Sequence, residues 1–200
     1  HSTLSMGVTV FSATEDSVDA ILQRVDLAMY QAKATGRDTL CFYDPSMHTQ
    51  ASERAALEVD MRAGLAQGQF ELYYQPQVDH GRIVAAEALL RWHHPQRGFV
   101  SPANFIPMAE ETGLILPLGQ WVLETACKQL AQWASDPQLA PLTLAVNVSP
   151  RQFRQLGFVQ QVLGTLASTG AAARRLKLEL TEGLLLHDVE EPVARRLELK

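Results

Sequence analysis

Short β-prone runs alternate with longer helix-periodic segments through most of this 200-residue chain. Such alternation is typical of an α/β fold with mainly parallel strands, because each intervening helix returns the chain to the end of the sheet where the previous strand began. One connection, Asp79–Arg82, is too short for a parallel crossover, so we expect the strands that it joins to be antiparallel neighbours. The strands predicted after residue 52 are 70–75, 83–92, 142–148 and 176–180.

Four strands in residues 53–200 are about half of what a (β/α)₈ barrel contains. A complete barrel needs eight strands and roughly 250 residues. We therefore predict an α/β fold in which these residues form a truncated (β/α)₈ barrel.

The first 44 residues follow a separate strand–helix–strand pattern. Alternating apolar residues predict a strand at 6–10, Ser17 is a candidate N-cap of a helix that stops at Gly36, and 39–43 is again β-prone. Such a unit has too few layers to complete a core, so it is expected to be a fragment of a domain. The turn-forming residues at 44–46 and the polar stretch to Ser52 predict a fragment at 1–44, a linker at 45–52 and a second domain at 53–200.

Composition excludes several classes of partner. Seventeen Lys and Arg residues against 22 Asp and Glu residues give a net charge of −5, which argues against a protein that binds nucleic acid through a positive field. The uncharged stretches are short and broken by Gly and Pro, so no membrane contact is expected within the chain. Cys41 and Cys127 match no metal-binding spacing, which favours a reducing, cytoplasmic setting.

Three oxygen-bearing side chains stand within or at the ends of otherwise apolar predicted strands: Glu87, Asn147 and Glu179. A buried carboxylate is costly unless it is paired or binds a metal, and the ends of parallel strands are where barrels place ligands. Oxygen donors from successive strands suit a hard cation such as Mg²⁺ or Mn²⁺. The alternative is that both glutamates face solvent or pair with Arg91 and Lys177.

Arg91 lies four residues after Glu87, so Glu87, Leu89 and Arg91 share one face of a strand. A guanidinium beside a metal-binding carboxylate is suited to clamp a phosphate, because its planar fork matches phosphate oxygens. An ion pair between Arg91 and Glu87 is the simpler alternative.

Several ordered motifs resemble those of the EAL domain family, and together they cover about residues 53–200. Ordered motifs at compatible spacing are far more specific than a single short match. They are Tyr74-Gln75-Pro76, Glu87-Ala88-Leu89-Leu90-Arg91-Trp92, Phe105-Ile106-Pro107, Ala109-Glu110-Glu111-Thr112-Gly113, Asn147-Val148-Ser149 and Glu179-Leu180-Thr181-Glu182.

The resemblance implies a modified (β/α)₈ TIM-like barrel with one antiparallel strand, and hydrolysis of cyclic di-GMP to linear pGpG with Mg²⁺ or Mn²⁺. It implies that Glu87, Asn147 and Glu179 are metal ligands. It further assigns a substrate phosphate to Arg91 and other substrate contacts to Gln75 and Leu89. Glu182 corresponds to a glutamate that steadies a loop of the site, and the implied catalytic carboxylates are Glu87, Glu179 and Glu182.

Residues 1–44 resemble the C-terminal end of a GGDEF domain. The resemblance rests on Ser5-Met6-Gly7, on the run Asp26–Lys33 and on Gly36-Arg37. It implies that Lys33 and Arg37 hold nucleotide phosphates, with GTP as a ligand of the whole protein. The chain is thus similar to an internal part of a tandem GGDEF–EAL protein of bacterial second-messenger signalling.

Two functions follow from the resemblance. The whole protein is expected to be a cyclic di-GMP phosphodiesterase that dimerises through its EAL domain. Segments upstream of this chain could anchor it to a membrane. Further family motifs would lie beyond Lys200, so the chain alone is expected to be inactive. The alternative is a catalytically inactive EAL domain that serves as a cyclic di-GMP receptor or a regulatory interaction module.

Overall fold

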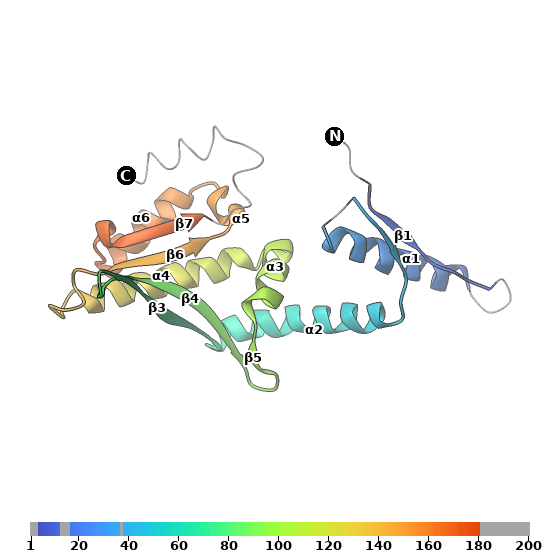
Figure 1. Cartoon of the computed structure of the whole chain (residues 1–200), viewed down its shortest axis with the longest axis horizontal. Coiled ribbons are helices and arrows are strands. Elements are labelled where there is room, and N and C mark those ends of the chain that lie inside the picture. The colour runs from blue at the N-terminus through green and yellow to red at the C-terminus, as the bar shows by residue number, and fades with distance from the viewer. Residues whose placement is uncertain (1–3, 13–16, 37, 181–200) are drawn as a thin grey trace. The chain divides into compact units, whose positions relative to one another are not determined.

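The computed structural model describes residues 4–12, 17–36 and 38–180 (Figure 1). The chain divides into two compact units, residues 1–59 and residues 60–200, and each is described by itself. Within the described ranges, no helix combines the length and the apolar character that crossing a membrane requires.

The first unit contains a parallel strand pair bridged by a helix. Strands β1 (Met6–Val8) and β2 (Leu40–Phe42) pair in parallel, and helix α1 (Val18–Ala34) connects them. Ser17 caps α1, since its side-chain oxygen accepts a hydrogen bond of 3.2 Å from the backbone N–H of Ala20. The expected strand–helix–strand order is therefore present.

The segment expected to be a linker is helical. Helix α2 spans Ser46–Ala66, so nearly all of residues 45–52 lies in its first turns. Asp44 starts this helix by accepting a hydrogen bond of 2.8 Å from the backbone N–H of Ser46. Hydrogen bonding from the Ser46 side chain, together with this backbone bond, lowers the pKa of Asp44. The polar composition of 45–52 reflects a solvent-facing helix start, which composition alone does not distinguish from a linker.

The second unit is built on a five-stranded mixed sheet. Its main path runs β3–β4–β6–β7, and the short β5 pairs with the far end of β4. Strands β3 and β4 are antiparallel as expected, whereas β4–β6 and β6–β7 are parallel. The strands are β3 (Phe70–Asp79), β4 (Arg82–His94), β5 (Gly98–Val100), β6 (Thr143–Val148) and β7 (Leu176–Leu180).

A two-residue turn joins β3 to β4. His80 and Gly81 have φ angles of 47° and 76°, the left-handed conformation that a tight hairpin turn requires at both central positions. Glycine adopts this conformation without steric cost, which explains Gly81 at the second position. The tight turn brings Gln75 of β3 opposite Glu87 of β4.

Helices connect the parallel strands. They are α3 (Pro102–Thr112), α4 (Ile115–Trp133), α5 (Pro150–Phe153) and α6 (Phe158–Thr169), followed by a short 3₁₀ helix at Ala173–Arg175. Helix α3 begins after Ser101 with Pro102 in its first turn and ends at Gly113, whose φ is 82°. Proline in the first turn and a left-handed glycine at the C-terminal end are both typical of helix ends.

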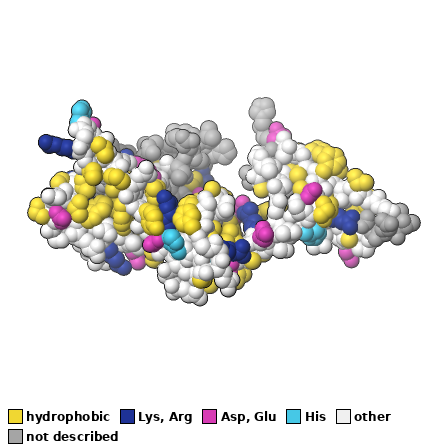
Figure 2. All heavy atoms as spheres, turned by 60° about the horizontal axis from the view of Figure 1, so that its bottom comes forward, with side chains coloured by type: hydrophobic (Ala, Val, Ile, Leu, Met, Phe, Trp, Pro, Cys, Tyr) yellow, Lys and Arg dark blue, Asp and Glu magenta, His cyan; other side chains and the backbone are white. Residues whose placement is uncertain are grey.

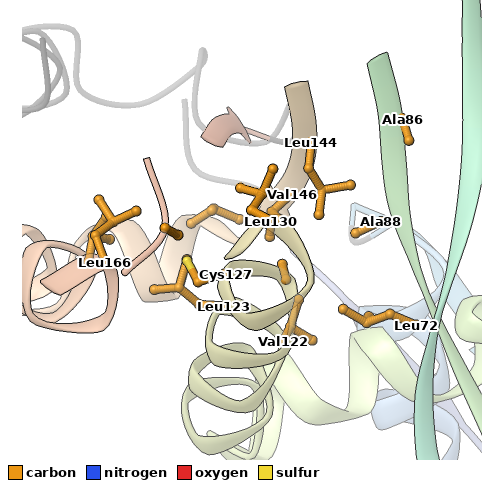
Figure 3. Close-up of a cluster of buried hydrophobic side chains, with 14 of the residues drawn as sticks. Leu72, Ala86, Ala88, Val122, Leu123, Cys127, Leu130, Leu144, Val146 and Leu166 are labelled. Carbon is orange, nitrogen blue, oxygen red and sulfur yellow. The ribbon is translucent and has the colours of Figure 1, made fainter. Parts of the chain in front are cut away.

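The hydrophobic core lies between one face of the sheet and helices α4 and α6. Figure 3 shows Leu72, Ala88 and Val146 of the strands facing side chains of α4, among them Val122 and Cys127. On β4 and β6 the core residues carry even numbers, because successive side chains on a strand point to opposite faces. The odd-numbered residues of these strands therefore lie on the face turned away from α4 and α6.

The sheet is open within the described residues. Strands β3 and β7 are the two ends of its path and do not pair with each other. The described residues therefore form an α/β fragment rather than the closed barrel that the fold family implies. An apolar groove lies beside β7, lined in part by Phe158, Val162 and Leu178.

A capping box fixes the chain where β6 passes into α5. The Ser149 side chain accepts a hydrogen bond of 3.2 Å from the backbone N–H of Gln152, and the Gln152 side chain accepts one of 3.2 Å from the backbone N–H of Ser149. Gln152 in turn lies against Gly119 of α4, where a Cβ atom would be 1.7 Å from Nε2 of Gln152.

We predict that Gly119→Ala destabilises the protein by about 1–3 kcal/mol, because the added methyl group must displace the buried Gln152 from its capping box. Chemical denaturation followed by circular dichroism measures the loss. Gly164→Ala is the matched control: Gly164 lies within α6 with no heavy atom within 4 Å of its Cβ position, so this change should stabilise by about 0.5–1 kcal/mol. Equal effects of the two substitutions would contradict the packing at Gly119.

Cys127 should be inert to thiol reagents. Its side chain is fully buried in the core, and burial raises its pKa to about 11, so the thiol stays protonated at pH 8. Cys41 is half-buried and also free. Titration with a chromogenic disulfide at pH 8 should label one thiol in the native protein, none in Cys41→Ser, and two after denaturation of the wild type. Fast native labelling of two thiols would contradict the burial of Cys127.

Candidate metal and phosphate site

The residues predicted to bind metal and substrate gather on the sheet face turned away from the core. Ala86 and Ala88 pack in the core, so Glu87 between them points to the opposite face. The same alternation places Asn147 between the buried Val146 and Val148. The predicted residues that share this face are Gln75, Leu89, Arg91, Glu87, Asn147 and Glu179.

Glu87 and Asn147 are in direct contact. Their strands β4 and β6 are parallel neighbours, with Glu87 in register with Ala145. From the next outward-facing position of β6, the amide nitrogen Nδ2 of Asn147 donates a hydrogen bond of 2.7 Å to Oε1 of Glu87. This bond fixes the orientation of the amide, whose oxygen Oδ1 can then accept a hydrogen bond or bind a cation.

Glu179 is adjacent to this pair. It is the register partner of Asn147 across β6 and β7, which places the two side chains side by side on the same face. Its carboxylate Oε1 lies 2.7 Å from the ammonium group of Lys177. The alternative that Glu179 pairs with Lys177 is therefore realised in the structure, whereas the contact seen for Glu87 is with Asn147 rather than with Arg91.

The donor set fits a hard divalent cation. Two carboxylates and one amide oxygen from three adjacent strands are the ligand types that Mg²⁺ and Mn²⁺ favour. Within the described residues, no group of three or more His, Cys, Asp or Glu side chains is arranged to hold a metal. The face instead combines two glutamates with an asparagine, so further ligands would have to be water, substrate or other parts of the protein.

Arg91 lies between two aromatic rings at the end of β4. Its guanidinium carbon is 5.4 Å from the ring centre of Tyr73 and 5.9 Å from that of Phe99, and Nη1 donates a hydrogen bond of 3.0 Å to the carbonyl of Leu90. Cation–π contacts of this kind hold a guanidinium in place while leaving its charge available. Sequence reasoning missed both rings. Tyr73 could have been found, because it shares a strand face with Gln75. Phe99 could not, because it belongs to β5, which was not predicted.

Gln75 and Leu89 both lie close to Glu87, Gln75 on the neighbouring strand β3 and Leu89 two residues further along β4. Gln75 is exposed and stands opposite Glu87 in the β3–β4 pairing, and Leu89 is half-buried and stands opposite Tyr73. The register therefore brings Gln75, Glu87 and Leu89 to one patch of the face.

Three predicted site residues are not brought to this face by the described structure. Lys33 is exposed in the last turn of α1, in the first unit, where it lines a groove with Asp26 and Tyr30. Arg37 and Glu182 lie outside the described residues.

The adjacent residues His93 and His94 stabilise the strands and the turn around them and do not bind a common ligand. His93 pairs with Glu71, whereas His94 is buried and points the other way. Nδ1 of His94 accepts hydrogen bonds from the backbone N–H groups of Gln96 (3.2 Å) and Arg97 (3.0 Å). His94 thereby organises the turn between β4 and β5.

The described surface seen in Figure 2 carries Lys and Arg side chains in separate small groups among Asp and Glu side chains, with hydrophobic side chains between them. No broad basic area is visible among the described residues on the side of the molecule shown in Figure 2. At the site itself, positive charge comes from Arg91 and Lys177.

Comparisons with known proteins show what this chain is similar to. The chain is 38% identical over 188 residues to "Bifunctional diguanylate cyclase/cyclic di-GMP phosphodiesterase MucR" of Pseudomonas aeruginosa, covering 93% of this chain and 27% of that protein. It is 33% identical over 191 residues to "Cyclic di-GMP phosphodiesterase PdeR" of Escherichia coli, covering 95% and 29%. The chain thus spans about a quarter of the length of the curated relatives that it matches.

Among solved structures, the chain resembles "PaMucR Phosphodiesterase, c-di-GMP complex" with a TM-score of 0.69 and 38% identity, covering 72% of this chain and 59% of that one. The family model described as "EAL domain" matches residues 58–198, which include all the strands described in the second unit. The chain therefore belongs to the EAL domain family, which includes relatives named as cyclic di-GMP phosphodiesterases.

Proposed function

We propose that the whole protein hydrolyses cyclic di-GMP to linear pGpG, and that this chain supplies the first part of the active site. One observation carries the proposal: Glu87, Asn147 and Glu179 stand on adjacent strands of one sheet face, joined by the 2.7 Å Asn147–Glu87 hydrogen bond and by the Asn147–Glu179 register pair. The relatives named as phosphodiesterases support the substrate class.

Each residue has a role in this proposal. Glu87, Asn147 and Glu179 would hold Mg²⁺ or Mn²⁺, and Arg91 would bind a phosphate of the substrate. Gln75 and Leu89 would contact the substrate beside them, and Glu182 would steady a neighbouring loop. The chemistry that a divalent cation supplies when bound is activation of water and neutralisation of phosphate charge.

The chain's own residues prepare the site for that chemistry. Asn147 holds the Glu87 carboxylate by donating a hydrogen bond to one oxygen, which leaves the other oxygen to act as a ligand. Tyr73 and Phe99 keep Arg91 from adopting many orientations, so less conformational entropy is lost when its guanidinium binds a phosphate.

We also propose the surrounding architecture. Residues 53–200 would belong to a modified (β/α)₈ barrel that the whole protein completes, and the EAL domain would form a homodimer. Residues 1–44 would be the end of a GGDEF domain, with Lys33 and Arg37 near the phosphates of GTP and 45–52 as the connection. The 188-residue alignment with MucR exceeds the span 58–198 of the family match, so it includes residues outside the EAL domain.

A receptor that binds cyclic di-GMP without cleaving it is the second candidate. The ion pair between Lys177 and Glu179 favours it, because an ammonium group already contacts one of the proposed metal ligands. Metal-dependent turnover separates the two candidates, since a receptor of this kind would bind the dinucleotide but release no pGpG.

We predict that Glu87→Ala lowers hydrolysis of cyclic di-GMP in the whole protein by about 10²-fold or more, because a metal ligand and its charge are lost. Formation of pGpG in the presence of Mn²⁺, followed by chromatography, measures the effect, and removal of the metal with a chelator should have the same result. Glu53→Ala, an exposed position of α2, is the matched control and should leave turnover unchanged. Undiminished turnover in Glu87→Ala would place the chemistry elsewhere.

Arg91 should contribute to cyclic di-GMP affinity through both charge and shape. Arg91→Ala is expected to weaken binding by about tenfold or more, and Arg91→Lys by less, because lysine keeps the charge but loses the planar fork. Calorimetry on the chelator-treated whole protein, in which cyclic di-GMP is not hydrolysed, measures both affinities. Equal losses would assign the effect to geometry alone, and no loss in either variant would remove Arg91 from the site.

A further inference from the structure

Lys177 lies on the candidate site face, although no motif includes it. It precedes Glu179 by two residues on β7, so both side chains point to the same side of the sheet. Its register partner is Ala145, which is also the register partner of Glu87 on the other side of β6. A small alanine therefore separates the backbone positions of Lys177 and Glu87.

The ammonium group of Lys177 contacts Glu179, one of the proposed metal ligands. Nζ lies 2.7 Å from Oε1 of Glu179, and the Lys177 side chain is 61% exposed while that of Glu179 is 31% exposed. The hydrogen bond and the charge of Glu179 raise the pKa of Lys177, and the charge of Glu87 adds to this. The direct contact of Lys177 is therefore with Glu179, whereas Glu87 acts on it only through charge at longer range.

A divalent cation would compete with the ammonium group for the Glu179 carboxylate. Even if the metal bound the second oxygen, Oε2, the two cations would lie within about 4 Å and repel each other, so metal binding is most favourable when Lys177 moves aside. The long lysine side chain is exposed enough to move, so the competition would lower metal affinity without blocking it.

We propose that Lys177 is a counter-cation built into the site: it holds Glu179 in the metal-free protein and weakens the binding of Mg²⁺ or Mn²⁺ by competing for that carboxylate. The inference rests on the proposed role of Glu179 as a metal ligand. Lys177 is a positioning residue in this proposal, because it acts on the metal through Glu179.

The test measures Mn²⁺ affinity of the whole protein by calorimetry at low ionic strength, without cyclic di-GMP. Lys177→Met should bind Mn²⁺ about two- to fivefold more tightly, the size expected from removing one exposed competing charge. Lys177→Arg keeps a cation beside Glu179 and should stay near the wild-type affinity. The gain in Lys177→Met should shrink as salt is added, since salt screens exposed charges.

Lys128→Met is the matched control. Lys128 is exposed on α4, which covers the opposite face of the sheet, and its replacement changes the net charge by the same amount. Unchanged Mn²⁺ affinity in this control would show that a gain in Lys177→Met comes from the local contact. An equal gain in both variants would overturn the proposal in favour of a general charge effect.

The outcomes separate this inference from the proposed function. Wild-type protein that binds Mn²⁺ through Glu87, with affinity unchanged or lowered in Lys177→Met, would overturn the role of Lys177 and leave the phosphodiesterase proposal standing. Wild-type protein that binds no Mn²⁺ at Glu87 would overturn both. Circular dichroism confirms folding, and Lys177→Gln provides the same charge removal should Lys177→Met fail to fold.

Discussion

The two-residue period of the β-strands is the constraint on which the second unit depends. Because neighbouring side chains on a strand point to opposite faces, the apolar residues that build the core against α4 and α6 leave every second position for the other face. Burial of residues such as Leu144 and Val146 supplies the stability of the unit. The polar side chains between them are then held on a rigid surface, and a functional site requires such a surface.

Charge placed on that surface needs partners. Glu87 and Glu179 are half-buried, so each loses part of its hydration and gains from a nearby donor. Asn147 donates a hydrogen bond from a neutral amide to Glu87, and Lys177 forms an ion pair with Glu179. The two glutamates therefore differ in what a metal would have to replace.

Much of this fold was predictable from local patterns. The antiparallel pairing of β3 with β4 followed from the short Asp79–Arg82 connection, and the strand–helix–strand order of the first unit followed from its apolar pattern and the candidate cap Ser17. The short strand β5 was missed because three residues carry too little periodicity to be recognised. The helical conformation of residues 46–52 was not predicted, because polar residues are common both in linkers and on exposed helix turns.

The sequence by itself determined which side chains share a strand face, because that depends only on the two-residue period along each strand. It therefore placed Glu87, Leu89 and Arg91 together, and motif order related them to Asn147 and Glu179. Only the tertiary structure decided the contacts between strands: that Asn147 reaches Glu87, that Lys177 holds Glu179, and that Phe99 covers Arg91. These contacts depend on strand order and register, which arise from the packing of the whole sheet against its helices and are not encoded in any single segment.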